Sequence, residues 1–204
     1  MSIYLLKPRF QSLLRPAVGT LHRLGVTANQ VTIAACAVSV VLGVGLYAAI
    51  DSAAAPSALL ALIPLWMLLR MAFNAIDGML AREFGQASRL GALLNELTDV
   101  LADAALFLPL ALLSPLQPVW VAAFALMAAL SEMAGALGPS VAASRRYDGP
   151  MGKSDRAFAV GAIALWAAVA PLPAGFALVM PALTLLTVLT VLRRMREALH
   201  EGAR

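Results

Sequence analysis

Long apolar stretches separated by short polar segments dominate the chain. A helix that crosses the hydrocarbon core of a membrane needs about 20 mainly apolar residues. Six stretches meet this requirement, at roughly residues 30–50, 57–78, 91–113, 118–138, 156–171 and 174–192. They lack the alternation of apolar and polar residues that a membrane barrel requires. The pattern therefore predicts an all-α integral membrane protein with six transmembrane helices.

Residues 3–24 follow a different pattern. Their apolar side chains recur at helical spacing, and basic side chains occupy much of the rest. A helix of this kind lies in the membrane interface and does not cross the bilayer. We expect one domain in which residues 1–25 form an amphipathic interfacial helix, 26–195 a six-helix bundle and 196–204 a basic tail. The alternative for the N-terminal segment is a frayed basic tail.

The composition excludes the two other broad classes of protein. Of the 204 residues, 61% are hydrophobic and 13% are charged, and the mean hydropathy is +0.85. A soluble domain of this size cannot bury so much apolar surface. Disorder requires low hydrophobicity and high net charge. A soluble globular domain and a disordered chain are therefore both ruled out.

The basic residues predict the topology. Lys and Arg residues are retained on the cytoplasmic side of a membrane. Three of the loops between the stretches contain neither, so both termini and the two basic loops are predicted to be cytoplasmic. The net charge of +4 then describes one face, which favours anionic lipid or phosphate as a partner over nucleic acid. The basic groups are Lys7, Arg9, Arg15 and Arg23 before the first stretch, Arg82 and Arg89 after the second, Arg145, Arg146, Lys153 and Arg156 after the fourth, and Arg193, Arg194, Arg196 and Arg204 after the sixth.

Polar side chains inside the apolar stretches form two clusters. Asn74 and Asp77 lie in the second stretch, and Asn95 and Asp99 lie in the third. Residues three or four apart share a helical face, and the two stretches run in opposite directions. The four side chains should therefore meet near the cytoplasmic end of the bundle. Carboxylate and amide oxygens suit Mg²⁺ or Mn²⁺.

Small residues and an arginine accompany this predicted cation site. Gly78, Ala81 and Gly91 allow a ligand to approach the backbone closely, and Arg82 offers a fork for phosphate oxygens. The combination indicates metal-assisted chemistry on a phosphate group at the membrane surface. Polar contacts between helices would explain one or two such residues, but they explain poorly two spaced pairs with an arginine beside them.

A basic loop supplies weaker candidates. Arg145, Arg146 and Lys153 could bind a phosphate on a second substrate or a lipid headgroup. The competing interpretation is that they serve only the topology.

Three ionisable residues lie deeper and have uncertain roles. Glu132 either lines a pocket for the second substrate or pairs with Arg70 or another buried group. Asp103 is expected close to the bilayer centre, where a carboxylate is more readily paired or protonated than poised as a base.

Two sequence motifs resemble those of a known family. The segment Asn74-x2-Asp77-Gly78-x2-Ala81-Arg82-x8-Gly91-x3-Asn95-x3-Asp99 resembles the signature D-x2-D-G-x2-A-R-x8-G-x3-D-x3-D of CDP-alcohol phosphatidyltransferases. The run Thr27-Ala28-Asn29-Gln30-Val31-Thr32 is similar to the T-P-N-x-x-T motif that opens the first span in that family, with Ala28 in place of proline.

The resemblance covers the whole chain and implies a function. Enzymes of this family transfer a phosphatidyl-type group from a CDP-linked donor, such as CDP-diacylglycerol, to an alcohol acceptor and release CMP. It implies a multi-pass protein of the bacterial inner membrane, active towards the cytoplasm in phospholipid biosynthesis, and a homodimer is common in the family. By resemblance, Asp99 is the general base, Asp77, Asn74, Asn95 and Asp99 are the metal ligands, and Asn29, Thr32, Gly78, Ala81, Arg82 and Gly91 contact the donor.

Two departures from the signature weaken the predicted metal site. Asn74 and Asn95 stand where the family has its first and third aspartates. An asparagine ligates through a neutral oxygen, so metal affinity without substrate should fall. The site then keeps one ion, or the donor diphosphate supplies the missing charge, or activity is lost. A catalytically silent CDP-lipid-binding or interaction protein is the alternative function. A small transporter is disfavoured because no internal repeat is evident.

Overall fold

The computed structural model describes residues 6–52 and 57–203, and this part of the chain contains helices and no strands. Residues 1–5 of the predicted interfacial helix lie outside the described residues. The helices are α1 (Leu6–Arg23), α2 (Ala28–Asp51), α3 (Ser57–Glu83), α4 (Arg89–Phe107), α5 (Pro118–Ala136), α6 (Lys153–Val169) and α7 (Val179–Gly202), with short 3-10 helices η2 (Leu108–Leu112), η3 (Gly138–Val141) and η4 (Ala174–Leu178).

Local side-chain bonds fix where the helices near the predicted site begin. Thr27 caps α2 by accepting the backbone N–H of Gln30, and the Gln30 side chain accepts the N–H of Thr27. Ser88 caps α4 in the same way, and Asp155 accepts the N–H of Gly152 before α6. Such caps satisfy backbone donors that have no partner within the helix. They therefore hold the ends of α2, α4 and α6 in place.

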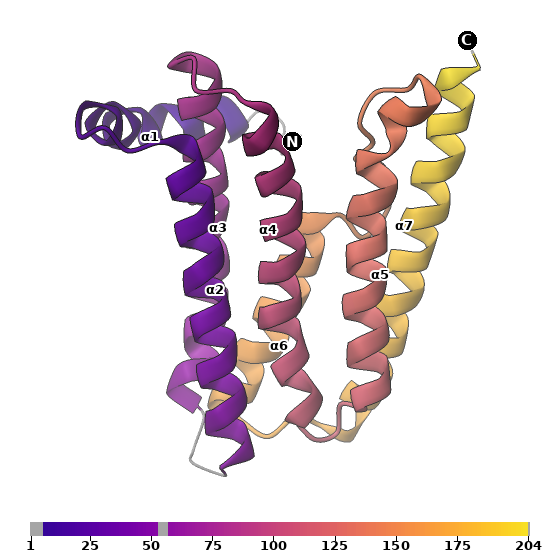
Figure 1. Cartoon of the computed structure of the whole chain (residues 1–204). Helices are drawn as coiled ribbons and strands as arrows, with labels where there is room; N and C mark the ends of the chain where they lie inside the picture. Colours follow the sequence, from indigo (N-terminus) through magenta and orange to yellow (C-terminus); the bar gives the residue numbers. More distant parts are fainter. Residues whose placement is uncertain (1–5, 53–56, 204) are drawn as a thin grey trace.

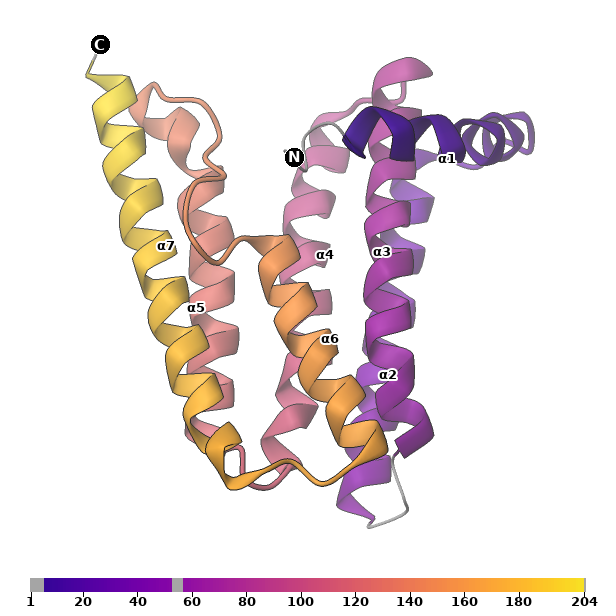
Figure 2. The same ribbon diagram turned by 180° about the vertical axis from the view of Figure 1, so that it is seen from behind.

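Helices α2 to α7 run side by side, and α1 lies across one end of the bundle (Figures 1 and 2). Helix α2 packs on α3 and α4, α3 on α6, α4 on α5, and α5 on α7. Gly43 allows the close approach of α2 to α4, because a side-chain carbon at this position would collide with the carbonyl of Ala105. Small residues at such crossings are typical of helices packed in a membrane.

The observed helices match the predicted stretches with differences at their ends. The third stretch divides into α4 and η2, and the sixth begins with η4. Residues 196–202, predicted as part of a basic tail, continue α7 as a helix. Helix α1 confirms the predicted N-terminal helix over residues 6–23, and Figure 1 places it at the same end of the bundle as the last turn of α7.

Four of the helical segments are long and apolar enough to cross a membrane: α2, residues 59–83 of α3, α5, and residues 174–202. The apolar sequence of α4 is interrupted by the acidic residues Glu96, Asp99 and Asp103, and α6 has only 17 residues. Both nevertheless lie within the bundle (Figure 2). The bundle therefore has six main helices, of which four meet the criterion for a span by length and composition.

The outward faces of the bundle are apolar. Large exposed hydrophobic side chains occur on every one of its main helices, as expected where hydrocarbon replaces water. They include Val41 and Val44 on α2, Leu65 and Leu68 on α3, Leu93, Leu97 and Leu101 on α4, Leu126 on α5, Phe158 and Val169 on α6, and Leu185 and Leu192 on α7.

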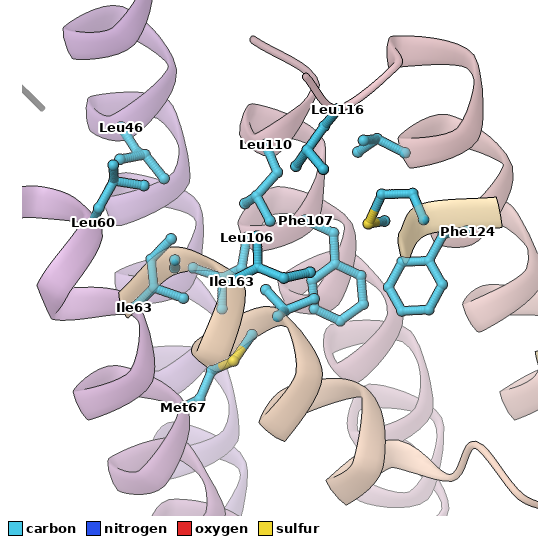
Figure 3. Close-up of a cluster of buried hydrophobic side chains, with 14 of the residues drawn as sticks. Leu46, Leu60, Ile63, Met67, Leu106, Phe107, Leu110, Leu116, Phe124 and Ile163 are labelled. Carbon is cyan, nitrogen blue, oxygen red and sulfur yellow. The ribbon is translucent and has the colours of Figure 1, made fainter. Parts of the chain in front are cut away.

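A buried apolar cluster joins the helices away from α1. Figure 3 shows its side chains converging from α2, α3, α4, η2, α5 and α6. They include Leu46, Leu60, Ile63, Met67, Leu106, Phe107, Leu110, Leu116, Phe124 and Ile163. The rings of Phe107 and Phe124 lie 5.3 Å apart between centroids, a separation that favours aromatic packing. The polar signature residues lie on the other halves of α3 and α4, so this cluster acts as the base that positions them.

Candidate active site

The signature residues gather around one pocket. A cavity of about 360 Å³ opens between the start of α2, the second half of α3 and the first half of α4. Ten residues predicted from the sequence line it: Asn29, Thr32, Asn74, Asp77, Gly78, Ala81, Arg82, Gly91, Asn95 and Arg145. We call this cavity the first pocket. The helical spacing thus brings the two motifs together, although 42 positions separate Thr32 from Asn74 in the chain.

Asp77 is the buried carboxylate of the first pocket. Its side chain is 6% exposed, and its Oδ2 accepts a hydrogen bond of 2.7 Å from the hydroxyl of Thr32. This bond fixes the carboxylate against α2. Within the described part of the chain no arginine or lysine forms a salt bridge with Asp77. The pocket therefore contains a negative charge that no basic side chain neutralises by direct contact.

Two glycines make room for polar side chains at the pocket wall. A side-chain carbon at Gly78 would lie 2.9 Å from a guanidinium nitrogen of Arg82, and one at Gly91 would lie 2.7 Å from Oδ1 of Asn29. Both distances are shorter than ordinary van der Waals contact. Glycine at these positions allows Arg82 to lie along α3 and allows Asn29 to reach α4. The two glycines thus leave room in the pocket wall for the Asn29 amide and for the Arg82 guanidinium, which is suited to bind phosphate.

A second pocket adjoins the first. It has a volume of about 440 Å³ and is lined by Asn74, Asn95, Asp99, Glu132, Arg145, Tyr147, Gly152, Lys153, Ser154, Asp155 and Arg194. Asn74, Asn95 and Arg145 line both pockets. The two signature asparagines therefore stand at the boundary, and Asp99 lies on the side of the second pocket. Two ligands could meet at this boundary, one from each side.

Asp99 is held by cationic side chains. Its Oδ1 accepts from Arg70 and from the Asn74 amide, each at 3.3 Å, and its Oδ2 lies 2.5 Å from the ammonium of Lys153. Arg70 also contacts Asp103 at 2.5 Å. Asp103 is buried and lies 3.6 Å from Arg156. Asp103 is thus paired, as the sequence analysis expected, and it lies deeper in the bundle than Asp99.

Glu132 sits among three arginines. Its Oε1 lies 2.6 Å from Arg156 and 3.5 Å from Arg194, and its Oε2 lies 3.5 Å from Arg145. It pairs with buried groups, one of the two roles considered for it, but Arg70 is not among these partners. It also lines the second pocket, and contact with a second substrate there stays a prediction. Arg156 is 0% exposed and Arg194 is 2% exposed. A buried charge requires a partner, and Glu132 provides it for both.

The sequence analysis assigned Arg156 and Arg194 to the topology and missed this buried network. One signal was available, because the polar residues of α7 recur at helical spacing. Thr184, Thr187, Thr190 and Arg194 are all buried on that helix. A polar stripe of this kind, ending in an arginine, indicates a helix face directed into the bundle.

The three residues of the basic loop separate in the structure. Arg145 lines both pockets and pairs with Glu96 and Glu132, and Lys153 lines the second pocket. Arg146 lines neither, because it pairs with Asp148 at 2.8 Å and with Glu201. Burial opposes ionisation of Asp148, but the hydrogen bond and charge of Arg146 outweigh it and hold the pKa of this carboxyl below its ordinary value. Arg146 thus ties the loop to α7.

The donor set at the pocket boundary fits one divalent cation. Within the described residues no three His, Cys, Asp or Glu side chains come together in a manner suited to a metal. Asp77 and the amides of Asn74 and Asn95 nevertheless line the same pocket. Their oxygens are the hard ligands that Mg²⁺ and Mn²⁺ prefer.

Comparisons with known structures identify the fold. The chain is similar to phosphatidylinositol phosphate synthase (PgsA1) of Mycobacterium tuberculosis solved with CDP-DAG bound, with a TM-score of 0.73 and 21% identity over 90% of this chain and 92% of that chain. It is equally similar to the same synthase in complex with manganese and citrate, with a TM-score of 0.73 and 22% identity over 90% and 87% of the two chains.

Comparisons of sequence identify the family. The chain is 44% identical to the inner membrane protein YnbA of Escherichia coli (strain K12) over 171 residues, which cover 84% of this chain and 83% of the relative. The profile of the CDP-alcohol phosphatidyltransferases matches residues 25–195, which include both sequence motifs and both pockets. The chain therefore belongs to the CDP-alcohol phosphatidyltransferase family, a class of membrane enzymes.

Proposed function

We propose that this protein transfers a phosphatidyl group from a CDP-linked lipid, such as CDP-diacylglycerol, to an alcohol and releases CMP. The observation that carries the proposal is the pair of adjoining pockets, which meet at the signature residues Asn74 and Asn95. Family membership supports the reaction class. A transfer reaction needs two substrates in contact, and two pockets with a common boundary supply that geometry.

The first pocket is proposed to bind the donor. Arg82 offers a guanidinium to phosphate oxygens, and Asn29 and Thr32 of α2 line the same pocket, where they would contact the nucleotide. The Mycobacterium tuberculosis synthase to which the fold is similar was solved with CDP-DAG bound. The same kind of donor is proposed for this chain because the small and basic residues around its first pocket have the spacing of the family signature.

The second pocket is proposed to bind the acceptor. Apart from Gly152, the residues that line it have polar or charged side chains, and Arg145, Lys153 and Arg194 contribute cationic groups. A second lipid would require an apolar lining for its chains. A small polar alcohol that carries an anionic group therefore fits this pocket best. Arg146 is not proposed as a ligand, because its guanidinium is committed to Asp148 and Glu201.

Asp99 is proposed as the general base. Its carboxylate lies in the wall of the acceptor pocket, next to the boundary with the donor pocket. The acceptor hydroxyl loses its proton to Asp99 as its oxygen forms a bond to the phosphorus nearest the lipid. The bond between that phosphorus and the bridging oxygen breaks, and CMP leaves with the electron pair. Contacts from Lys153 and Arg70 hold the Asp99 carboxylate in position before the transfer.

A divalent cation, Mg²⁺ or Mn²⁺, is proposed to assist the reaction. Asp77 would hold it together with the amide oxygens of Asn74 and Asn95, with Asp99 at the edge of the site. When bound, the ion supplies positive charge to the phosphate oxygens. The second Mycobacterium tuberculosis structure was solved in complex with manganese.

We further propose a location in the bacterial inner membrane with all six main helices spanning it. The relative from Escherichia coli is named as an inner membrane protein. Helix α1 and the C-terminal end of α7 lie at the same end of the bundle (Figure 1). Both segments contain several basic residues, so this end is proposed to face the cytoplasm. A homodimer remains a prediction from the family.

The proposal is tested by CMP release from radiolabelled CDP-diacylglycerol. Purified protein is incubated with Mg²⁺ or Mn²⁺ and with a panel of alcohols that includes phosphorylated and neutral members. Release that depends on the alcohol supports the transferase. The alternative, motivated by Asn74 and Asn95, is a silent relative that binds the donor without releasing CMP. Lipid mass spectrometry after overexpression then identifies the new headgroup.

A further inference from the structure

The charges around Asp99 set how many metal ions this site can hold. Sites for phosphoryl transfer built from several carboxylates commonly hold two divalent ions that share ligands. The signature positions of this chain carry two carboxylates, Asp77 and Asp99, and two neutral amides, Asn74 and Asn95. This chain therefore lacks two of the four aspartates of the family signature, and less positive charge is needed to balance the two carboxylates that it keeps.

The two carboxylates have different surroundings. Asp77 accepts the Thr32 hydroxyl at 2.7 Å and forms no salt bridge within the described residues. Asp99 has a cation on each oxygen, with Arg70 at 3.3 Å from Oδ1 and Lys153 at 2.5 Å from Oδ2. A divalent ion at Asp77 meets an uncompensated negative charge. A divalent ion at Asp99 would meet an ammonium and a guanidinium already in place.

Lys153 reaches Asp99 from a separate element. It is the first residue of α6, and the capped N-terminus of that helix fixes its position, since Asp155 accepts the N–H of Gly152 at 2.9 Å. The ammonium lies at the wall of the second pocket, beside Asp99. An ammonium is a compact, strongly hydrated point charge. It therefore resembles a metal ion in its compact size and localised charge more closely than a guanidinium does.

We propose that the ammonium of Lys153 takes the place of a second metal ion, so that this protein holds one divalent cation, at Asp77. Three residues then act together against a second ion. The amides of Asn74 and Asn95 lower the negative charge of the site, and Lys153 adds a positive charge to it. The inference rests on the proposed function in one respect, because both place a divalent cation at Asp77. It names a further positioning residue, which fixes Asp99 and bears a charge that a metal would otherwise supply.

The test counts bound ions and does not depend on turnover. Purified full-length protein is dialysed to equilibrium against radioactive Mn²⁺ with CDP on both sides of the membrane, and bound Mn²⁺ is counted per chain. The wild type is expected to bind one ion. Asn74→Asp combined with Asn95→Asp is expected still to bind one, with any second ion weaker by about tenfold or more because Lys153 remains. Adding Lys153→Met to these two changes is expected to give two ions.

Electron paramagnetic resonance supplies a second readout, because two adjacent Mn²⁺ ions give an exchange-coupled signal. Only the triple variant should show it, and Lys153→Arg in place of Lys153→Met should suppress it by retaining the charge. Lys153→Gln replaces Lys153→Met if the latter does not fold. Two ions or none in the wild type would overturn the inference, as would a double variant that binds two ions as tightly as the triple. One bound ion without CMP release would instead refute the proposed function alone.

Discussion

The buried network around Glu132 gives the sharpest prediction about stability. Glutamine has nearly the shape of glutamate but no charge, so Glu132→Gln removes the partner of Arg156 and Arg194 without creating a cavity. Glu132 is 7% exposed, and the two arginines are 0% and 2% exposed. None of these groups can recover its hydration when the pairing is lost. The change therefore leaves two guanidinium charges buried and poorly compensated.

The expected loss follows from this burial. Removing one partner of a buried ion pair costs about 3–5 kcal/mol. Arg156 keeps a contact of 3.6 Å with Asp103, which places the expected cost near the lower end of that range. A protein of this size loses roughly 2–4 °C in Tm per kcal/mol, so Glu132→Gln should lower Tm by about 6–12 °C.

The assay is thermal unfolding in detergent, followed by size-exclusion chromatography of the heated samples. Glu83→Gln is the matched control, since it makes the same chemical change at an ion pair whose side chains are 62% and 36% exposed. An exposed pair contributes about 0–1 kcal/mol, so this control should hardly move Tm. Equal shifts for the two variants would refute the reasoning that burial decides the effect.

Three other predictions concern activity and the metal. Asp99→Asn should abolish CMP release, whereas Asp103→Asn should leave measurable turnover of a folded protein, because Asp103 pairs with Arg70 behind the site; the opposite result would show that the base is misassigned. Arg82→Ala should raise the KM for the CDP donor more than Arg146→Ala does, because only Arg82 lines the first pocket, and equal losses in donor affinity would contradict this ranking. Donor-free protein should bind Mg²⁺ weakly in a calorimetric titration, because two of the four signature ligands are neutral amides, and tight binding would contradict the expectation.

The first pocket could be predicted from the sequence because it depends on regular geometry. Asn74, Asp77 and Arg82 follow the repeat of one helix, and Gly91 and Asn95 follow that of the next. Two helices joined by a short loop run in opposite directions, so their facing residues meet. The resemblance to the T-P-N-x-x-T motif places Thr27 at the start of the first bundle helix, where its cap is observed.

The second pocket could not be predicted in the same way. It depends on where the chain runs between η3 and α6, which brings Arg145 and Lys153 back to α4. No periodic pattern encodes that path. The arginines at 156 and 194 were also ambiguous, because a basic residue at the end of an apolar stretch satisfies the topology whether it is exposed or buried. Only the contacts of these two arginines with Glu132 of α5 distinguish the two cases.

The apolar pattern predicted six membrane-spanning helices, but within the described residues four meet the criterion of length and composition. Helix α4 carries the acidic half of the signature and is less apolar than a typical span, and α6 has 17 residues. Both pack inside the bundle, where their buried charged side chains pair with side chains of neighbouring helices. Tertiary contacts thus replace the hydrophobic length that an isolated helix would need.

The most direct test of the account follows the phosphorus atom nearest the lipid. CDP-diacylglycerol labelled at that phosphorus is incubated with purified protein, Mn²⁺ and a small anionic alcohol, and the products are separated by chromatography. The account predicts that all of the released label enters one new lipid that contains the alcohol, in equal amount to unlabelled CMP, and that Asp77→Ala forms neither. Label in phosphatidic acid alone, or no CMP from the wild type with any alcohol while the donor still binds, would contradict it.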